Sequence, residues 1–319
     1  MAVSPTELNR ALDGVAEFFQ SRQTRAGVVA RRLIGASTVE DDSLANQLIN
    51  ERRRKTRLDG GIGGWVSATS WSAWELLQLG CPPDHTGLLR MIGYLLARQD
   101  AAGRFGEGCS ERRHARGYCH HFVSGFFSPG SKDERTAPLV FPSGAVITKE
   151  WDARFACSCF ALRTALHARQ ERRESVARHV DSLIYLAERW QTSEYPVNPD
   201  VAFTAMAAIA SAPMGKREQA VRIANRLIAF QRPEGDWENA SLYHAVDALL
   251  ALSTSTAREA IIKATQKMVE DQRPDGSFDE HANEEIALIA LRSFKSLGAH
   301  RAKPRPPRLS PTRLPVREH

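Results

Sequence analysis

The sequence predicts an all-α fold, a ring of helical hairpins of the (α/α)6 toroid type with one long loop insertion. The first observation behind this prediction is a repeated phrase of the form Gln-x-x-x-Gly-x-aromatic, which occupies residues 231–237 and returns at 272–278. The two copies start 41 residues apart, a spacing that suits one helical hairpin per repeat. A looser copy occupies residues 99–105. A single repeat of this size cannot bury its apolar face alone, so neighbouring hairpins must stack.

The second observation is that predicted helices of two kinds alternate along the C-terminal half. One kind is rich in alanine and other small or apolar residues, so it must be covered on all sides, whereas the other kind has a single apolar face. Two concentric layers of helices satisfy both kinds and leave a central cavity. The predicted inner helices are 150–168, 199–211, 239–253 and 282–297, and the predicted outer helices are 173–191, 216–230 and 256–271.

The N-terminal half supplies the remaining hairpins, which bring the ring to about six. Its first helix starts with Ser4 as the cap, Pro5 at the first position and Glu7 closing a capping box. A glycine-rich break ends in Gly64-Trp65, which repeats the end of the phrase. The predicted helices here are 6–20, 25–36, 41–57, a helix around 70–77, and 86–98 after a Pro-Pro pair.

Composition and cysteine usage indicate a protein of the cytoplasm. Apolar residues make up 42% and charged residues 25% of the chain, and no uninterrupted apolar run reaches the 18 residues typical of a membrane span. The N-terminal residues lack the basic and apolar segments of an export signal. The five cysteines are an odd number, which fits reduced thiols. We therefore expect a cytoplasmic protein without a transmembrane segment.

The basic charge is concentrated at the C-terminus. The chain carries a formal charge of +6, and residues 300–319 contain six basic residues against one acidic residue. We therefore expect residues 1–299 to form the toroid domain and 300–319 to form a disordered, basic, proline-rich tail. Because the remaining body is nearly neutral, no nucleic-acid partner is expected. A weak contact of the tail with an anionic surface stays open.

The predicted insertion covers residues 106–148, which show no sustained helical period. A connection of this length is usually functional or mobile. Its aromatic residues stand between Gly/Pro turns at 125–130 and 141–144. This arrangement suits a lid over an apolar pocket, and the alternative is that the aromatic side chains fasten the loop to the ring.

Part of the insertion is rich in cysteine, histidine and arginine, and three interpretations of it stay open. Thiols and imidazoles could close a tetrahedral zinc site, although their order matches no familiar finger spacing. Guanidinium and imidazole groups could bind the diphosphate or carboxylate head group of a ligand. The third interpretation is a solvated loop. The metal candidates are Cys109, His114, Cys119 and His120, and the anion-binding candidates are Arg112, Arg113, Arg116 and His121.

From about Gly60 to Leu297, the repeated phrase followed by an alanine-rich inner helix resembles the squalene-cyclase-like family of terpene cyclases and protein prenyltransferases. The resemblance implies an α/α barrel whose axial cavity, lined by the ends of the inner helices, holds an isoprenoid. Because related toroids bind very different ligands, it is more specific for the fold than for the chemistry.

The resemblance also points to residues 200–205, which match part of the Asp-x-Asp-Asp-Thr-Ala signature of class II terpene cyclases. Asp200 and the Thr-Ala pair are present, whereas Ala202 and Phe203 replace the two following acids. Protonation of an alkene requires a neutral carboxylic acid in an apolar cavity, and alanine cannot supply it. Asp200 is a candidate catalytic residue, and the alternative is that it favours the start of its helix. The helix at 242–247 lacks the cysteine of the prenyltransferase zinc site.

Other residues near the starts of predicted inner helices are candidates for the site. Asp152 and Glu150 could replace the missing cyclase acid, or they could favour a helix N-terminus, which is the simpler role for Glu150. The paired Cys157 and Cys159 point in nearly opposite directions on a helix, which favours core packing over metal binding. The substrate-binding candidates in this group are Trp71, Arg154, Tyr243 and His244.

Three functions follow from these observations. The leading hypothesis is a terpene-cyclase-like or prenyltransferase-like enzyme that acts on an isoprenoid or a similarly apolar small molecule in the central cavity. The second is a non-catalytic toroid that binds a ligand or a partner. The third is a metal-dependent enzyme that uses zinc in the Cys/His-rich insertion.

Overall fold

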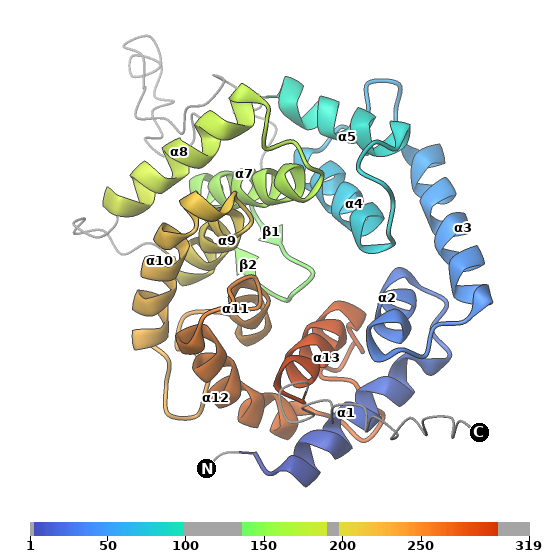
Figure 1. The fold of residues 1–319 in the computed structure, drawn as a ribbon, viewed down its shortest axis with the longest axis vertical. Helices are drawn as coiled ribbons and strands as arrows, with labels where there is room; N and C mark the ends of the chain where they lie inside the picture. Colours follow the sequence, from blue (N-terminus) through green and yellow to red (C-terminus); the bar gives the residue numbers. More distant parts are fainter. Residues whose placement is uncertain (1–2, 99–135, 190–197, 299–319) are drawn as a thin grey trace, which may run out of the picture.

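The computed structural model describes residues 3–98, 136–189 and 198–298. Within these ranges, twelve α-helices form a closed ring of two concentric layers (Figure 1), which confirms the predicted all-α toroid. The inner helices are α2 (Arg25–Ile34), α4 (Val66–Gln78), α7 (Glu150–His167), α9 (Pro199–Ala210), α11 (Leu242–Leu249) and α13 (Glu284–Gly298). The outer helices are α1 (Pro5–Gln20), α3 (Val39–Lys55), α5 (Thr86–Ala97), α8 (Glu174–Arg189), α10 (Glu218–Ala229) and α12 (Ser255–Asp271).

The burial of neighbouring helices follows the predicted alternation of two kinds. Every residue of α9 from Asp200 to Ala210 is buried, as expected for a helix that is apolar nearly all round. In the outer helix α10, the buried residues are confined to Gln219, Ala220, Ile223 and Ala224, which lie on one face. A helix of the first kind therefore lies in the inner layer, and a helix of the second kind covers it.

The repeated phrase fastens each outer helix to the next one. In the first copy, Gly235 adopts a φ of +98°, and a Cβ atom there would lie 2.2 Å from the carbonyl oxygen of Lys263 on α12. Only glycine permits this conformation together with such a close approach. The side chain of Gln231 donates from Nε2 to the carbonyl oxygens of Gly235 (2.7 Å) and Ala260 (2.9 Å). The phrase is therefore part of the scaffold.

The second copy closes the ring by the same geometry. Gly276 has a φ of +81°, and a Cβ atom there would lie 2.2 Å from the carbonyl oxygen of Gly14 on α1. Gln272 donates from Nε2 to the carbonyl oxygen of Ala11 at 2.9 Å. The last repeat is thus completed by the first helix of the chain.

A further copy of this turn precedes α4, and the sequence prediction placed its aromatic end three residues too late. Gly60 takes the place of Gly235 and Gly276. Its φ is +94°, and a Cβ atom there would lie 2.2 Å from the carbonyl oxygen of Arg90 on the next outer helix, α5. The backbone amide of Gly60 donates to Arg57, as Gly235 donates to Arg232. Trp65, predicted to end the phrase, is half exposed, and the aromatic position is taken by the aliphatic Ile62. The register of this copy was not recognised in the sequence because it lacks the glutamine and the aromatic residue of the repeated phrase.

A short antiparallel hairpin lies within the ring when it is viewed along its axis (Figure 1). Its strands are β1 (Leu139–Val140) and β2 (Val146–Ile147), with Leu139 paired to Ile147. The hairpin belongs to the predicted insertion 106–148, of which residues 136–148 are described and contain no helix before α7. The copy of the phrase at 99–105, the aromatic turn at 125–130 and the predicted tail lie outside the described residues.

Every helix in the described ranges is too short or too polar to cross a bilayer.

Candidate ligand-binding site

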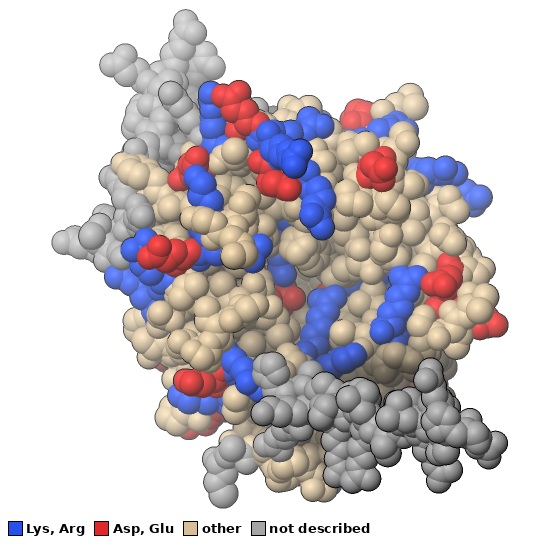
Figure 2. Space-filling model, in the orientation of Figure 1, with Lys and Arg blue, Asp and Glu red and all other residues tan. Residues whose placement is uncertain are grey.

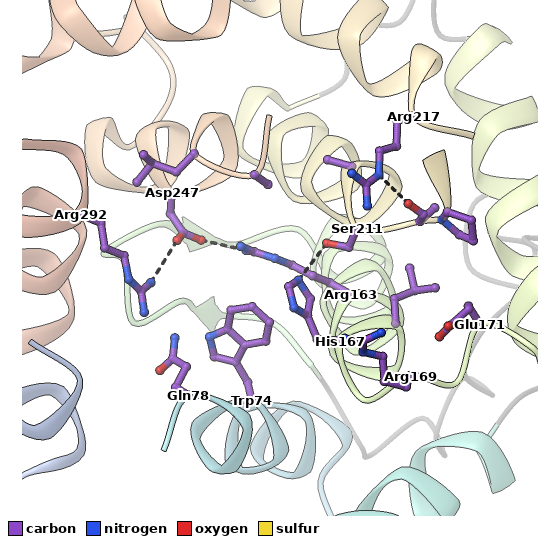
Figure 3. Close-up of a pocket in the computed structure, with 16 residues that line it drawn as sticks. Trp74, Gln78, Arg163, His167, Arg169, Glu171, Ser211, Arg217, Asp247 and Arg292 are labelled. Carbon is purple, nitrogen blue, oxygen red and sulfur yellow. Dashed lines mark hydrogen bonds and ion pairs between the residues drawn. The ribbon is translucent and has the colours of Figure 1, made fainter. Parts of the chain in front are cut away.

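A cavity of about 860 Å³ lies at the end of the ring where the inner helices finish. The space-filling view shows a hollow at the centre of this face, with basic side chains around it (Figure 2). The lining comes from the last turns of the inner helices and from the loops after α7 and α9 (Figure 3). Its polar and aromatic members are Trp74, Gln78, Arg163, His167, Arg169, Glu171, Ser211, Arg217, Asp247 and Arg292.

Arg163 of α7 forms the centre of the cavity floor. Its Nη1 donates to Asp247 Oδ2 at 2.8 Å, and its guanidinium carbon lies 4.7 Å from the centre of the Trp74 ring, a cation–π contact. The side chain of Arg292 reaches the same carboxylate, with Nη1 3.8 Å from Asp247 Oδ1. Although burial acts to raise it, the pKa of Asp247 is lowered by these two arginines, so the carboxylate is ionised.

Three polar atoms of the lining are buried without a hydrogen-bond partner among the described residues. They are the Nε atom of Arg163, the Nε2 atom of Gln78 and the Oε2 atom of Glu171. A buried donor or acceptor without a partner costs about 1–3 kcal/mol, which a bound ligand or water can recover. Figure 3 shows Gln78 and Arg292 on one side of the cavity and Glu171 on the other.

His167 stands beside the floor as a neutral imidazole. The hydroxyl of Ser211 donates to the carbonyl oxygen of Ala207 at 2.8 Å, so its oxygen is free to accept. His167 Nε2 therefore donates to Ser211 Oγ at 3.1 Å. Partial burial, and second the nearby charge of Arg163, lower the pKa of His167. The positive charge of the cavity therefore comes from arginines.

The tip of the hairpin fills the other end of the ring axis. Phe141 packs against Phe160 at 5.9 Å between ring centres and against His244 at 4.8 Å. Asn283 Nδ2 donates to the carbonyl oxygen of Pro142 at 3.1 Å. A space of only about 20 Å³ remains between the tip and the floor. The aromatic turn 141–144 is thus fastened to the ring, and a role of the insertion as a lid stays a prediction.

His244, a predicted substrate-binding residue, holds the hairpin tip in place. Thr204 donates its hydroxyl proton to the carbonyl oxygen of Asp200 at 2.7 Å, so His244 Nε2 is the donor to Thr204 Oγ1 at 2.9 Å. The opposite nitrogen, Nδ1, accepts from Ser143 Oγ at 2.8 Å. Burial lowers the pKa of His244, which stabilises this neutral form, although Asp200 and Asp247 act to raise it.

Two of the three predicted catalytic acids are engaged by the backbone. Glu150 accepts from the amides of Thr136 (2.9 Å) and Ala137 (2.8 Å) and from Arg154, so its pKa is lowered although burial acts to raise it. Asp200 accepts from the amide of Ser241 at 2.9 Å. Burial raises the pKa of Asp200, while His244 acts to lower it. Glu150 thus anchors the chain before β1, and Asp200 joins the starts of α9 and α11.

Asp152 differs from the other two acids. It is buried, at 4% exposure, and burial raises the pKa of its carboxyl group despite the opposing charge of Lys149. None of the described residues donates a hydrogen bond to it. It stands near the start of α7, eleven residues before Arg163, which corresponds to about 16 Å along a helix. Asp152 is therefore remote from the floor of the large cavity.

Of the other predicted site residues, some pack against the repeated phrase and others lie near the ring axis. Tyr243 packs against Phe278 of the repeated phrase at 5.9 Å, and Phe203 packs against Trp237 of the first copy at 5.4 Å. Trp71 stacks on Phe160 at 5.7 Å and lines the small space beside the hairpin. Arg154 pairs with Glu150. The described free cysteines, Cys81, Cys157 and Cys159, are all buried.

The predicted metal and anion sites of the insertion lie outside the described residues. This holds for Cys109, Arg112, Arg113, His114, Arg116, Cys119, His120 and His121. Among residues 3–98, 136–189 and 198–298, no three His, Cys, Asp or Glu side chains come together as metal ligands. The zinc hypothesis stays a prediction.

The residues of the cavity floor were missed at the sequence level, although the sequence holds a signal for them. Arg163 and His167 are four residues apart on the C-terminal, mostly apolar half of one helix, and Asp247 and Arg292 interrupt apolar runs of two others. A charged side chain on a helix that is covered on all sides must face the axial cavity or a buried partner. Applied to all the inner helices, this rule includes these four residues together with others such as Glu75, Asp200 and Glu285, so it gives a set of candidates that only the structure divides.

Comparisons with known proteins agree on the fold alone. No protein-family model and no curated protein sequence matches the chain. Among solved structures, it is similar to a variant of the type II terpene cyclase MstE from Scytonema in complex with its product merosterolic acid A. The TM-score is 0.53 at 14% sequence identity, and the match covers 92% of this chain and 98% of the cyclase. The chain therefore has a terpene-cyclase-like fold over most of its length.

Proposed function

We propose that the protein is a terpene-cyclase-like toroid that holds an isoprenoid or a similarly apolar small molecule in its axial cavity. The observation that carries the proposal is the cavity of about 860 Å³ on the ring axis, a size within the range of small-molecule sites. Leu166, Leu250 and Ala251 supply apolar lining, and Trp74 supplies an aromatic face. The terpene cyclase of similar fold holds a terpenoid product, which supports the same class of ligand here.

A cavity-filling variant tests this proposal. Isothermal titration calorimetry of farnesol and geranylgeraniol measures binding to the full chain. In Ala251→Phe, the added ring occupies part of the cavity, so affinity falls at least about tenfold, the effect of 1.4 kcal/mol. The matched control is Ala229→Phe, at the exposed end of α10, which leaves binding unchanged. Absence of binding by the wild-type protein, or equal loss in both variants, overturns the proposal.

A second candidate function is cyclisation, and the environment of Asp152 favours it. A carboxyl group that burial keeps closer to its neutral form is suited to donate a proton to an alkene. The carbocation that forms would be stabilised by the faces of aromatic residues such as Trp71 and Phe160. For the substrate to reach Asp152, the hairpin tip has to leave the axis, because it fills that end.

Product analysis separates catalysis from binding. The protein is incubated with farnesol, geranylgeraniol and squalene, and extracts are examined by gas chromatography and mass spectrometry. Cyclisation requires a new product with wild-type protein, its loss in Asp152→Asn, and its retention in Asp13→Asn, which changes an exposed acid on α1. Binding without any product supports the non-catalytic toroid. Elemental analysis of the full-length protein tests the zinc hypothesis directly.

A further inference from the structure

The floor of the axial cavity carries an excess of positive charge and unused hydrogen-bond donors. Arg163 and Arg292 share the single carboxylate of Asp247, which leaves one positive charge without a counterion in the floor. The side chain of Arg163 is 10% exposed, and its buried Nε–H finds no acceptor among the described residues. An uncompensated buried guanidinium is costly, and an anionic ligand relieves that cost.

A second orphan donor lies on the same side of the cavity. Gln78 accepts from Arg25 through Oε1, which fixes the amide so that Nε2 is its donor end. That Nε2 is buried and has no acceptor. Figure 3 shows Gln78 next to Trp74, whose ring supports the guanidinium of Arg163, with Arg292 on the same side of the cavity. Donor groups from α4, α7 and α13 therefore line this position at the floor.

We propose that this position is a carboxylate-binding subsite formed by Arg163, Arg292 and Gln78, which fixes the acidic end of the molecule held in the cavity. The inference rests on the proposed function and adds the chemical class of the ligand, an apolar carboxylic acid.

The charge of the floor favours a carboxylate over a diphosphate. Arg163, Arg292 and Asp247 together carry one excess positive charge, which a carboxylate neutralises, whereas a diphosphate would bring further negative charge next to Asp247. The remaining charged lining residues, Arg169, Arg217 and Glu171, belong to the rest of the cavity. The planar guanidinium of Arg163 is held by Asp247 through Nη1, and its Nε–H is left without an acceptor among the described residues; arginine favours carboxylates as partners for such donors. Asp247 lines the same floor, and its charge is offset by its two arginine partners.

Three ligands with the same carbon chain test the subsite by calorimetry on the full chain: farnesoic acid, farnesol and farnesyl diphosphate. Farnesoic acid binds the wild-type protein about 10- to 100-fold more tightly than farnesol, the range that a charge-assisted hydrogen bond gives. Farnesyl diphosphate binds more weakly than the acid. Tighter binding of the diphosphate overturns the carboxylate assignment in favour of a phosphate site.

Two variants and a control locate the effect. Arg163→Lys keeps a positive charge beside Asp247 and removes the Nε donor, and Arg292→Gln removes the shared charge. Each lowers the affinity for farnesoic acid at least about tenfold and changes that for farnesol less than about threefold. Arg258→Gln, which changes an exposed arginine of α12 outside the cavity lining, leaves the preference for the acid unchanged.

The outcomes separate the subsite from the proposed function. If farnesol and farnesoic acid bind equally and neither variant matters, the subsite is wrong and the apolar cavity stands. If none of the three ligands binds, the proposed function fails and the subsite fails with it. Circular dichroism melting of each variant confirms that a loss of binding is not a loss of folding.

Discussion

The hydroxyl of Ser143 donates to Nδ1 of His244 at 2.8 Å and so joins residues 101 positions apart in the chain. Both residues are buried, and the opposite nitrogen of His244 reaches Thr204 on α9. One imidazole thus connects the hairpin tip to two inner helices. The hairpin is held in the ring by a specific polar contact in addition to the packing of Phe141.

Replacement of His244 is expected to loosen the hairpin. His244→Ala removes a buried ring with two hydrogen-bonded nitrogens and leaves Ser143 Oγ without its acceptor. We expect the free energy of unfolding to fall by about 2–4 kcal/mol, measured by urea denaturation. His281→Ala, which changes an exposed histidine, should cost less than about 0.5 kcal/mol. Equal effects of the two substitutions would contradict the fastening role.

The same histidine makes stability depend on pH. Burial lowers the pKa of His244 in the folded state, so on acidification the unfolded chain takes up this proton first. Its contribution is therefore complete above the unfolded pKa, near 6.5, and is lost as pH falls below it, by up to about 1.4 kcal/mol per pH unit.

The test compares urea denaturation at pH 7.5, 6.5 and 5.5 for the wild-type protein and His244→Asn. The groups that face His244 are Asp200, Asp247, Arg163 and Ser143. The pKa of Asp200 is raised in the folded state, so its protonation stabilises the fold as pH falls and opposes the effect of His244. The wild-type protein should lose more stability than His244→Asn between pH 6.5 and 5.5. A variant with the same slope would show that the titration of His244 does not contribute.

Replacing a turn glycine and replacing a helix glycine should change the free energy of unfolding in opposite directions. Gly276→Ala forces a side chain into a φ of +81° and against the carbonyl oxygen of Gly14, so we expect a loss of at least about 2 kcal/mol. Gly93 on α5 has open space around it, and Gly93→Ala should stabilise the protein by about 0.5–1 kcal/mol because alanine favours the helix. Thermal and urea unfolding of both variants measure the difference. Similar losses at both positions would refute the geometric argument.

The ring also depends on a buried arginine near its closure. Arg25 of α2 pairs with Glu285 of α13 and lies 3.5 Å from Glu75 of α4. Arg25→Ala leaves these largely buried carboxylates undercompensated, and we expect a loss of about 3 kcal/mol. Arg178→Ala, which breaks an exposed pair with Glu174, should cost less than about 1 kcal/mol. Chemical denaturation of the two variants provides the comparison, and a small effect of Arg25→Ala would show that water or Arg52 replaces it.

The fold was largely predictable because its signals are local and repeated. The predicted helix 256–271 differs from α12 by one residue at its start, where Thr254 is the N-cap. The predicted helix 239–253 is longer than α11, which begins at Leu242, because the turn of the repeated phrase continues through Ser241. Periodicity identifies such helices well and their ends less well.

The site was less predictable because it is assembled by the ring. The sequence prediction sought function at the starts of the inner helices and in the insertion, whereas the cavity of about 860 Å³ lies at the other ends of these helices. Arg163 and Asp247 are 84 positions apart and meet only when α7 and α11 face the same axis. No local spacing encodes that pair. The roles predicted for Asp152, Asp200 and Glu150 in catalysis remain predictions.

The hairpin tip makes the two ends of the ring axis different. Among the described residues, the axis is filled at one end and open at the other, so the ring has the form of a cup whose bottom is Arg163, Asp247 and Trp74. A guest enters such a cup with one end leading and leaves with that end last. The end that enters first meets Arg163, Asp247 and Trp74, so the two ends of a bound molecule lie in different surroundings.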